Sequence, residues 1–293
     1  MDLPGATEPK LMEFTVKRLG GNLGARIEGI DFATALTADT ISFIADTVFE
    51  HQVVSIAATD LSPTQHQAIA ERFGELEHNA TDQFSTDTVH PFITIIDSSK
   101  GDRADMWHCD ETFLEHPPLV NLLHCQQIPE YGGDTAFRSA AAAYDGLSEP
   151  IKQLVAGLSA IHDYGHLYEM GWRAGIPIAE MVGDALLKGL LFSHPLVKTH
   201  PVTGRKWLTP NVTYTRFIEG LNPLEADYLL RMLLDHLQKP EYCYRHQWQE
   251  GDLVIWDQQA VQHYAVGDFD GRRVMHRISA LATLETYTGI KSN

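Results

Sequence analysis

Residues 92–138 hold four short segments, FITIID (92–97), MWHCDETF (106–113), LVNLLHCQ (119–126) and DTAFR (134–138). Short runs rich in β-branched and aromatic side chains, separated by turn-forming residues, are typical of β-strands. The C-terminal part continues in the same way, with YCYRHQW (242–248), DLVIWD (252–257) and RRVMHRISALA (272–282). This succession predicts a mainly β protein with a double-stranded β-helix (jelly-roll) core, and it argues against a parallel doubly wound sheet.

Amphipathic segments around these strands predict flanking helices. Thr37 is suited to N-cap one of them, and Ser62-Pro63-Thr64-Gln65 forms a capping box with proline at the first helical position. The expected helices cover residues 38–50, 63–73, 149–158 and 223–237. No repeat or flexible linker divides the chain, so we expect one domain over residues 1–293. The stretch 165–190 fits no strand, and we expect a long insertion there, either a lid over a site or a segment packed against the sheet.

The charge balance narrows the choice of partners. Lys and Arg total 22, Asp and Glu total 39, and the formal net charge is −17. Nucleic acids and anionic membrane surfaces need clustered basic residues, so neither is an expected partner. No apolar run approaches the roughly 18 residues of a membrane span. Three cysteines without CxxC spacing argue against a disulfide framework, and we expect a cytoplasmic globular protein.

The histidines suggest metal chemistry, because the sequence lacks GxxxxGK[ST], GxGxxG, GxSxG and HExxH. Within segment 106–113, the two-residue period of a strand places His108 and Asp110 on one face and Cys109 on the other. Such a pair can bind one metal ion, although a strand histidine is more often simply packed. His263, shortly after DLVIWD, offers a third ligand. Two histidines and one carboxylate are typical of non-haem Fe(II) oxygenases.

A pair of arginines lies on the last expected strand. Arg273 and Arg277 are four residues apart, so strand alternation directs them to the same face. Guanidinium groups bind carboxylate or sulfonate groups in a bidentate manner, which favours anionic ligands beside them. Alternatively, the two arginines lie on an exposed strand face and form ion pairs with some of the 39 acidic residues.

Four spaced motifs occur in order along the chain: Trp107-His108-x-Asp110-x-Thr112-Phe113, Gly132-Gly133-Asp134-Thr135, Trp256-Asp257-x5-His263-Tyr264 and Arg272-Arg273-x-Met275-His276-Arg277. This set resembles the TauD/TfdA family of Fe(II)- and 2-oxoglutarate-dependent dioxygenases, and the likeness extends over most of the chain. The resemblance implies that His108, Asp110 and His263 bind Fe(II), and that Thr135 and Arg273 hold the distal carboxylate of 2-oxoglutarate. It also implies a reaction with O2 that yields succinate, CO2 and a hydroxylated substrate.

The resemblance assigns Arg277 to the anionic group of the substrate, which favours a sulfonate, a sulfate ester or a carboxylate. Four further positions are expected to contact the substrate by the same likeness: Asn79, Asp82, Glu111 and Tyr164. Asn79, Asp82 and Glu111 depart from the pattern expected for taurine, and they argue against taurine itself. We expect a bulkier substrate, or one with a cationic group facing Asp82 or Glu111.

Two other functions use the same three metal ligands. One is a zinc-dependent hydrolase that activates water, and the other is a catalytically silent binding protein. Arg273, Arg277 and Thr135 argue against the hydrolase, because they suit a dicarboxylate cosubstrate. We therefore expect a dioxygenase that acts on a small anionic or zwitterionic molecule and, by family likeness, forms a homodimer or homotetramer.

Overall fold

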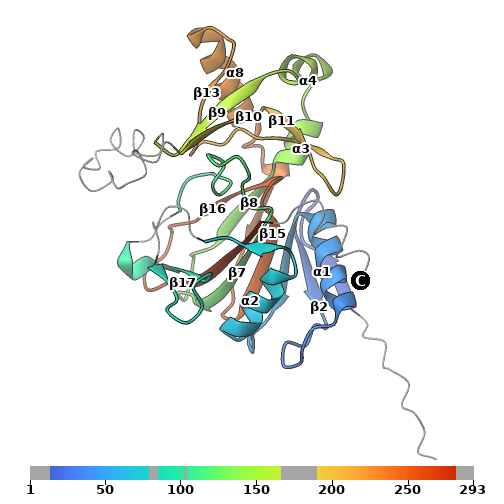
Figure 1. Ribbon diagram of the computed structural model, residues 1–293, viewed down its shortest axis with the longest axis vertical. Coiled ribbons are helices and arrows are strands. Elements are labelled where there is room, and N and C mark those ends of the chain that lie inside the picture. The colour runs from blue at the N-terminus through green and yellow to red at the C-terminus, as the bar shows by residue number, and fades with distance from the viewer. Residues whose placement is uncertain (1–13, 79–84, 102–103, 166–189, 282–293) are drawn as a thin grey trace, which may run out of the picture.

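A large, mostly antiparallel sheet forms one side of the protein core. The computed structural model describes residues 14–78, 85–101, 104–165 and 190–281. The strands of this sheet are β1 (Thr15–Arg18), β2 (Ala25–Glu28), β3 (Val53–Ala57), β4 (Glu75–Leu76), β5 (Ser85–Thr86), β6 (Thr94–Asp97), β7 (Val120–Gln127), β15 (Asp252–Asp257) and β17 (Val274–Leu281). Their order is β1-β2-β3-β15-β7-β17-β6-β5, and β4 pairs with β17. Segments from both ends of the chain therefore meet at the centre of the sheet (Figure 1).

A second, smaller sheet faces the large one. Its strands are β8 (Thr135–Ser139), β14 (Cys243–His246) and β16 (Val261–Ala265), in the order β14-β8-β16. Leu123 on β7, Trp256 on β15 and Met275 on β17 pack against Phe137 on β8 and Val261 on β16. Two facing sheets with this apolar filling form the jelly-roll core, so the expected fold class is confirmed.

Two helices cover the outer face of the large sheet (Figure 1). They are α1 (Ala38–His51) and α2 (Pro63–Glu71). Thr37 caps α1 by accepting a hydrogen bond from Thr40 N at 3.2 Å, and Ser62 and Gln65 form the expected capping box of α2. Apolar side chains of both helices pack on the sheet in one buried cluster. The two N-terminal helices are therefore confirmed within a few residues.

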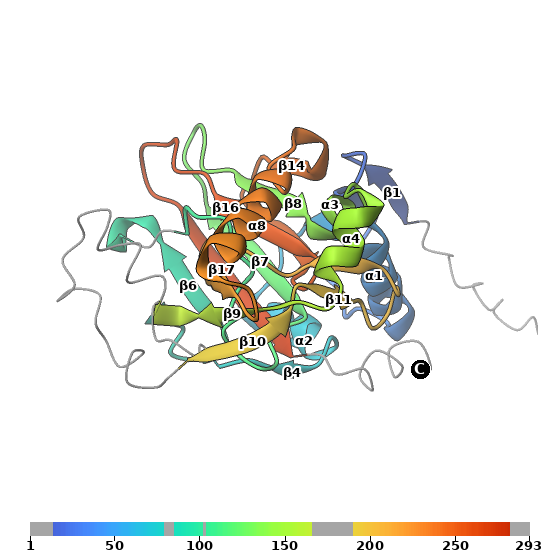
Figure 2. The ribbon, with the colours of Figure 1, turned by 90° about the horizontal axis from the view of Figure 1, so that it is seen from above.

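The remaining elements gather at one end of the sheets (Figures 1 and 2). They are α3 (Ala140–Asp145), α4 (Glu149–Val155), β9 (Ser159–Asp163), β10 (Leu191–Pro195), β11 (Val197–Thr199), β12 (Lys206–Leu208), β13 (Thr215–Ile218), α8 (Pro223–His236) and η2 (Pro240–Tyr242). A short 3-10 helix, η1 (Ser98–Lys100), lies apart from them and follows β6. The expected lid at 165–190 falls almost wholly outside the described residues. Within the described ranges, no helix combines the length and apolar character needed to cross a membrane.

Candidate active site

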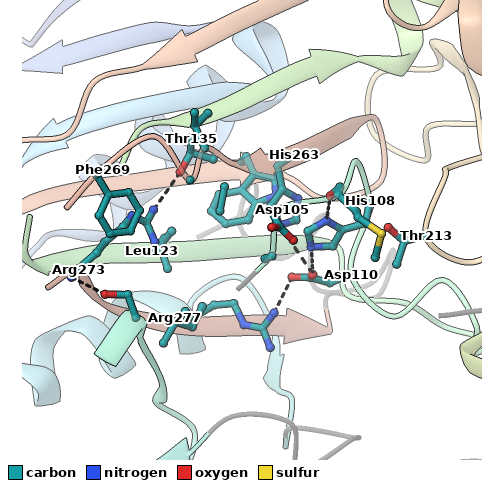
Figure 3. A pocket seen from close by; sticks show the side chains of 18 of the residues that line it. Asp105, His108, Asp110, Leu123, Thr135, Thr213, His263, Phe269, Arg273 and Arg277 are labelled. Atoms are coloured by element: carbon teal, nitrogen blue, oxygen red, sulfur yellow. Dashed lines mark hydrogen bonds and ion pairs between the residues drawn. The ribbon is translucent and has the colours of Figure 1, made fainter. Parts of the chain in front are cut away.

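Three side chains bring metal-binding atoms together between the two sheets (Figure 3). His108 Nε2 lies 3.2 Å from Asp110 Oδ1, and His263 Nε2 lies 3.7 Å from the same oxygen. All three residues are buried, and their ligand atoms lie within 4.8 Å of one another. In the described part of the chain, no other group of His, Cys, Asp or Glu has this spacing. The three expected ligands are therefore brought together.

The segment that carries His108 is not the strand expected at 106–113. Only His108 pairs, in an isolated bridge to His263: His108 N donates to His263 O at 3.1 Å, and His263 N donates to His108 O at 2.8 Å. The chain then turns at Asp110, and Glu111 has a left-handed backbone conformation with φ of 57°. The strand prediction for 106–113 was wrong, because the chain turns after His108 and successive side chains no longer alternate between two faces. As a result Glu111 lines the same cavity as Asp110.

The hydrogen bonds of His108 and Asp110 engage one nitrogen of the imidazole and one oxygen of the carboxylate. The other nitrogen and the other oxygen can therefore bind a metal ion. His108 Nδ1 lies 2.6 Å from Met106 O, so Nδ1 carries the proton and Nε2 keeps its lone pair. Asp110 Oδ2 accepts hydrogen bonds of 2.7 Å from both Asn121 Nδ2 and Arg277 Nη1. Asp110 Oδ1 remains directed at the two histidines. This donor set fits Fe(II), which accepts imidazole and carboxylate ligands.

The charges of these side chains also suit an ion. Burial alone would raise the pKa of Asp110, but the positive charge of Arg277 and the interactions with His263 and His108 together outweigh it and lower this pKa far below its usual range. Burial, with repulsion from His108, lowers the pKa of His263 to about 3. At neutral pH Asp110 is therefore ionised and His263 is neutral, which are the forms that bind a metal ion.

A second group of polar side chains lies further along the same cavity, which has a volume of about 320 Å³. Arg273 Nη2 donates to Thr135 Oγ1 at 3.2 Å, and Arg273 Nε donates to Gly133 O at 2.9 Å (Figure 3). Trp248 Nε1 donates to the same Thr135 hydroxyl at 2.9 Å. Burial lowers the pKa of Arg273 to about 10, so the guanidinium stays charged at neutral pH. Across the described residues no carboxylate forms an ion pair with Arg273, which suits it to an anionic ligand.

The residues expected to contact the substrate have different positions. Arg277 and Glu111 line the cavity. Tyr164 is buried and is not part of the cavity wall, and its ring packs edge-on against Phe113, with ring centroids 4.9 Å apart. Because Phe113 does line the cavity, Tyr164 supports the wall from behind. Asn79 and Asp82 lie outside the described residues.

Two amide side chains at the site are missed by sequence reasoning. Asn121 holds Asp110 and also donates to Gln258 Oε1 at 3.2 Å. Gln258 accepts a 2.7 Å hydrogen bond from Trp256 Nε1 and donates to Asp110 O at 3.4 Å. A single amide inside the apolar run of β7 is a signal that would have pointed to Asn121. Gln258 directly follows the Trp256-Asp257 motif, which is a weaker signal.

Several known proteins are similar to this chain over nearly its whole length. The model of the taurine catabolism dioxygenase TauD, TfdA family matches residues 15–279. An alkylsulfatase from Acinetobacter baylyi is 35% identical, over 94% of this chain and 87% of the relative. An alpha-ketoglutarate-dependent sulfate ester dioxygenase from Pseudomonas putida is 30% identical, over 94% and 91%. The crystal structure of a taurine dioxygenase from Burkholderia xenovorans matches with a TM-score of 0.77 and 28% identity, over 92% and 91%.

These likenesses agree with the geometry of the cavity. A zinc hydrolase is not favoured, because the family model and the relative from Pseudomonas putida are named as dioxygenases. The enzyme class brings with it Fe(II) as cofactor and 2-oxoglutarate and O2 as cosubstrates. Sequence motifs, fold and ligand geometry thus lead to one assignment: the chain belongs to the TauD/TfdA family and is an Fe(II)- and 2-oxoglutarate-dependent dioxygenase.

Proposed function

We propose that the enzyme hydroxylates a small acidic substrate, an organosulfonate, an alkyl sulfate or a carboxylate, and releases succinate and CO2. The observation that carries this proposal is Arg277, an arginine with an 11% exposed side chain on the cavity wall beside the metal ligand Asp110. An acidic substrate is attracted to such a cation in a site with little water. Relatives named for sulfate esters and for phenoxypropionate support an acidic substrate.

We assign the site residues as follows. His108, Asp110 and His263 hold Fe(II), which with 2-oxoglutarate supplies the oxidising power for a C–H bond. Thr135 and Arg273 orient the distal carboxylate of 2-oxoglutarate, and the hydrogen bond from Trp248 fixes the hydroxyl of Thr135. Arg277 has two tasks, because it holds Asp110 Oδ2 through Nη1 and presents its charge to the cavity.

The acidic side chains of the cavity refine the substrate class. Asp105, Glu111 and Asp270 line it together with the two arginines. Burial and a hydrogen bond with Glu111 raise the pKa of Glu77 to about 10, so Glu77 is protonated at neutral pH and adds no charge. Carboxylates near a bound anion favour a substrate that also carries a cationic or hydrogen-bond-donating group. Glu111 is the residue we assign to that group.

A substrate panel tests the proposal. Alkyl sulfates, sulfonates, aryloxy acids and zwitterionic amino acids are incubated with Fe(II), 2-oxoglutarate and air, and succinate is measured together with sulfite or sulfate. We expect at least one acidic compound to stimulate succinate formation well above the level without substrate. Arg277→Met should abolish the stimulation, whereas Leu154→Ala, which alters an exposed side chain, should keep it. Stimulation by neutral compounds alone would contradict the proposal.

Assembly, location and domain structure complete the proposal. We propose a homodimer or homotetramer, supported by the exposed apolar side chains of Leu224 and Tyr228, four residues apart on α8 and each 66% exposed. Sedimentation of the wild type and of Leu224→Glu tests this.

We also propose a single domain over residues 1–293 and a cytoplasmic location, the latter supported by three cysteines that are free thiols.

A further inference from the structure

Arg138, on β8, carries a buried positive charge for which the described residues offer no anionic partner. Its side chain is 0% exposed, and within the described ranges no carboxylate forms an ion pair with it. Its Nη1 atom finds no hydrogen-bond partner among the residues that the structure describes. Burial lowers the pKa of Arg138 to about 10, so the guanidinium is still charged at neutral pH. An unpaired buried charge is strongly unfavourable for folding. Its presence therefore points to a role other than stability.

The contacts of Arg138 connect two segments that carry metal ligands. Its Nε and Nη2 atoms donate to Gln262 Oε1 at 3.0 and 2.6 Å. Its guanidinium carbon lies 4.5 Å from the ring centroid of Trp107, as a cation–π contact. Gln262 directly precedes His263, and Trp107 directly precedes His108. Arg138 therefore contacts the neighbour of each histidine ligand.

The segment around His108 is held by separate contacts and not by a continuous strand ladder: Ala265 N donates to Ala104 O at 2.9 Å, and Cys109 Sγ donates to Val261 O at 3.2 Å. It belongs to no strand, and its pairing with β16 is the isolated bridge between His108 and His263. Strand alternation on β16 directs Gln262 away from the cavity that His263 lines, and Trp107 is likewise absent from the cavity wall. Gln262 is itself fixed, because its Nε2 donates to Pro210 O at 2.7 Å.

We propose that Arg138 is a positioning residue for the metal centre. Its guanidinium holds Trp107 and Gln262 together behind the ligands and so sets the separation of His108 and His263. This inference rests on the proposed role of both histidines as ligands. Residues behind metal ligands keep them in place, and their loss typically weakens metal binding by roughly 10- to 100-fold.

Titration of the metal-free protein with Co(II), followed by calorimetry and by the visible spectrum of the bound ion, tests the proposal. Arg138→Met should bind Co(II) roughly 10- to 100-fold more weakly and change the visible spectrum. Arg138→Lys, which keeps the charge but not the two-pronged contact with Gln262, should also weaken binding. The matched control is Arg205→Met, because Arg205 is a partly exposed arginine paired with Asp145. Its Co(II) affinity should equal that of the wild type.

Two further measurements separate positioning from a purely structural role. The thermal unfolding of each metal-free variant is recorded, and titrations are made well below its midpoint. A folded Arg138→Met variant with wild-type Co(II) affinity and spectrum would overturn the proposal. If that variant does not fold, Gln262→Leu removes the acceptor through which Arg138 acts, and unchanged affinity there has the same meaning. Co(II) affinity needs no substrate, so failure of the proposed substrate class would leave this test intact.

Discussion

At the scale of single residues, the two carboxylate oxygens of Asp110 make different contacts. Oδ1 faces both histidines, and Oδ2 is held by Asn121 and Arg277. The three residues that the cavity brings together could be predicted from sequence, because the resemblance of four spaced motifs to the TauD/TfdA family implies them, whereas the HxD spacing alone suggests only a pair. The different contacts of the two oxygens could not be predicted, because Asn121 and Arg277 lie on other strands, far from Asp110 in the sequence.

Loss of Asn121 should therefore weaken the metal site. We expect Asn121→Ala to lower Co(II) affinity roughly 10-fold, since Asp110 Oδ2 loses one of its two donors and the carboxylate can rotate. Isothermal titration of the metal-free protein measures this. Gln153→Ala, on the exposed side of α4, is the control and should bind Co(II) as the wild type does. Equal affinities of the two variants would contradict the role given to Asn121.

Arg273 should affect the cosubstrate more than the metal. Arg273→Met removes a charged donor from the proposed 2-oxoglutarate carboxylate, and such hydrogen bonds stabilise by about 1.5–3 kcal/mol. We expect the KM for 2-oxoglutarate to rise roughly 10- to 100-fold, with Co(II) affinity little changed.

The neighbouring Arg272 provides the comparison for this experiment. Arg272 pairs with Asp97 and is absent from the cavity wall. Arg272→Met should therefore reduce stability and leave the KM for 2-oxoglutarate unchanged. A similar rise of KM in both variants would show that the effect is not specific to Arg273.

At the scale of elements, capping and periodicity predict the helices well, and the segment around His108 shows where such reasoning fails. Thr37 and Ser62 cap helices as expected, and Asn222 caps α8 in the same way, because capping depends on residues a few positions apart. Segment 106–113 has the composition of a strand. It forms a turn instead, because Glu111 adopts a left-handed conformation that no local preference of glutamate predicts.

The packing of α2 on the large sheet predicts sensitivity to acid. His66 on α2 is 1% exposed, and His124 and His276 lie on the strands beneath it. Burial, with repulsion from these two histidines, lowers the pKa of His66 well below its usual value. The unfolded chain therefore binds more protons as pH falls below about 6.5, and the free energy of unfolding decreases by up to about 1.4 kcal/mol per pH unit.

His66→Leu should reduce this dependence. Urea unfolding at pH 7 and pH 5 should show a smaller loss of stability in the variant than in the wild type. His116→Leu serves as the control, because the side chain of His116 is 88% exposed, and it should keep the wild-type dependence. If all three proteins lose the same stability between the two pH values, His66 is not the origin of the effect.

At the scale of the whole molecule, the net charge of −17 opposes the cosubstrate that the cavity attracts. Raising the ionic strength from about 0.01 M to 0.15 M shortens the Debye length from about 30 Å to 8 Å. This screens the repulsion between distant surface charges and a dianion, but it affects the buried Arg273 little. We expect the KM for 2-oxoglutarate to fall about two- to threefold.

The KM for 2-oxoglutarate is measured from steady-state succinate formation at matched ionic strength in chloride and in acetate. A difference between the two salts would reveal competition by the salt anion itself. A KM that rises with ionic strength in both salts would mean that attraction by exposed positive charge controls binding.

The bridge between His108 and His263 also has a consequence for the order of events during synthesis. Positions 108 and 263 are 155 residues apart, and Arg273, just before β17, and Arg277, on β17, follow later still. A ribosome therefore completes most of the polypeptide before the third ligand exists. We therefore expect iron to bind after most of the chain has been made, and metal-free enzyme made under iron starvation should regain activity when iron is restored.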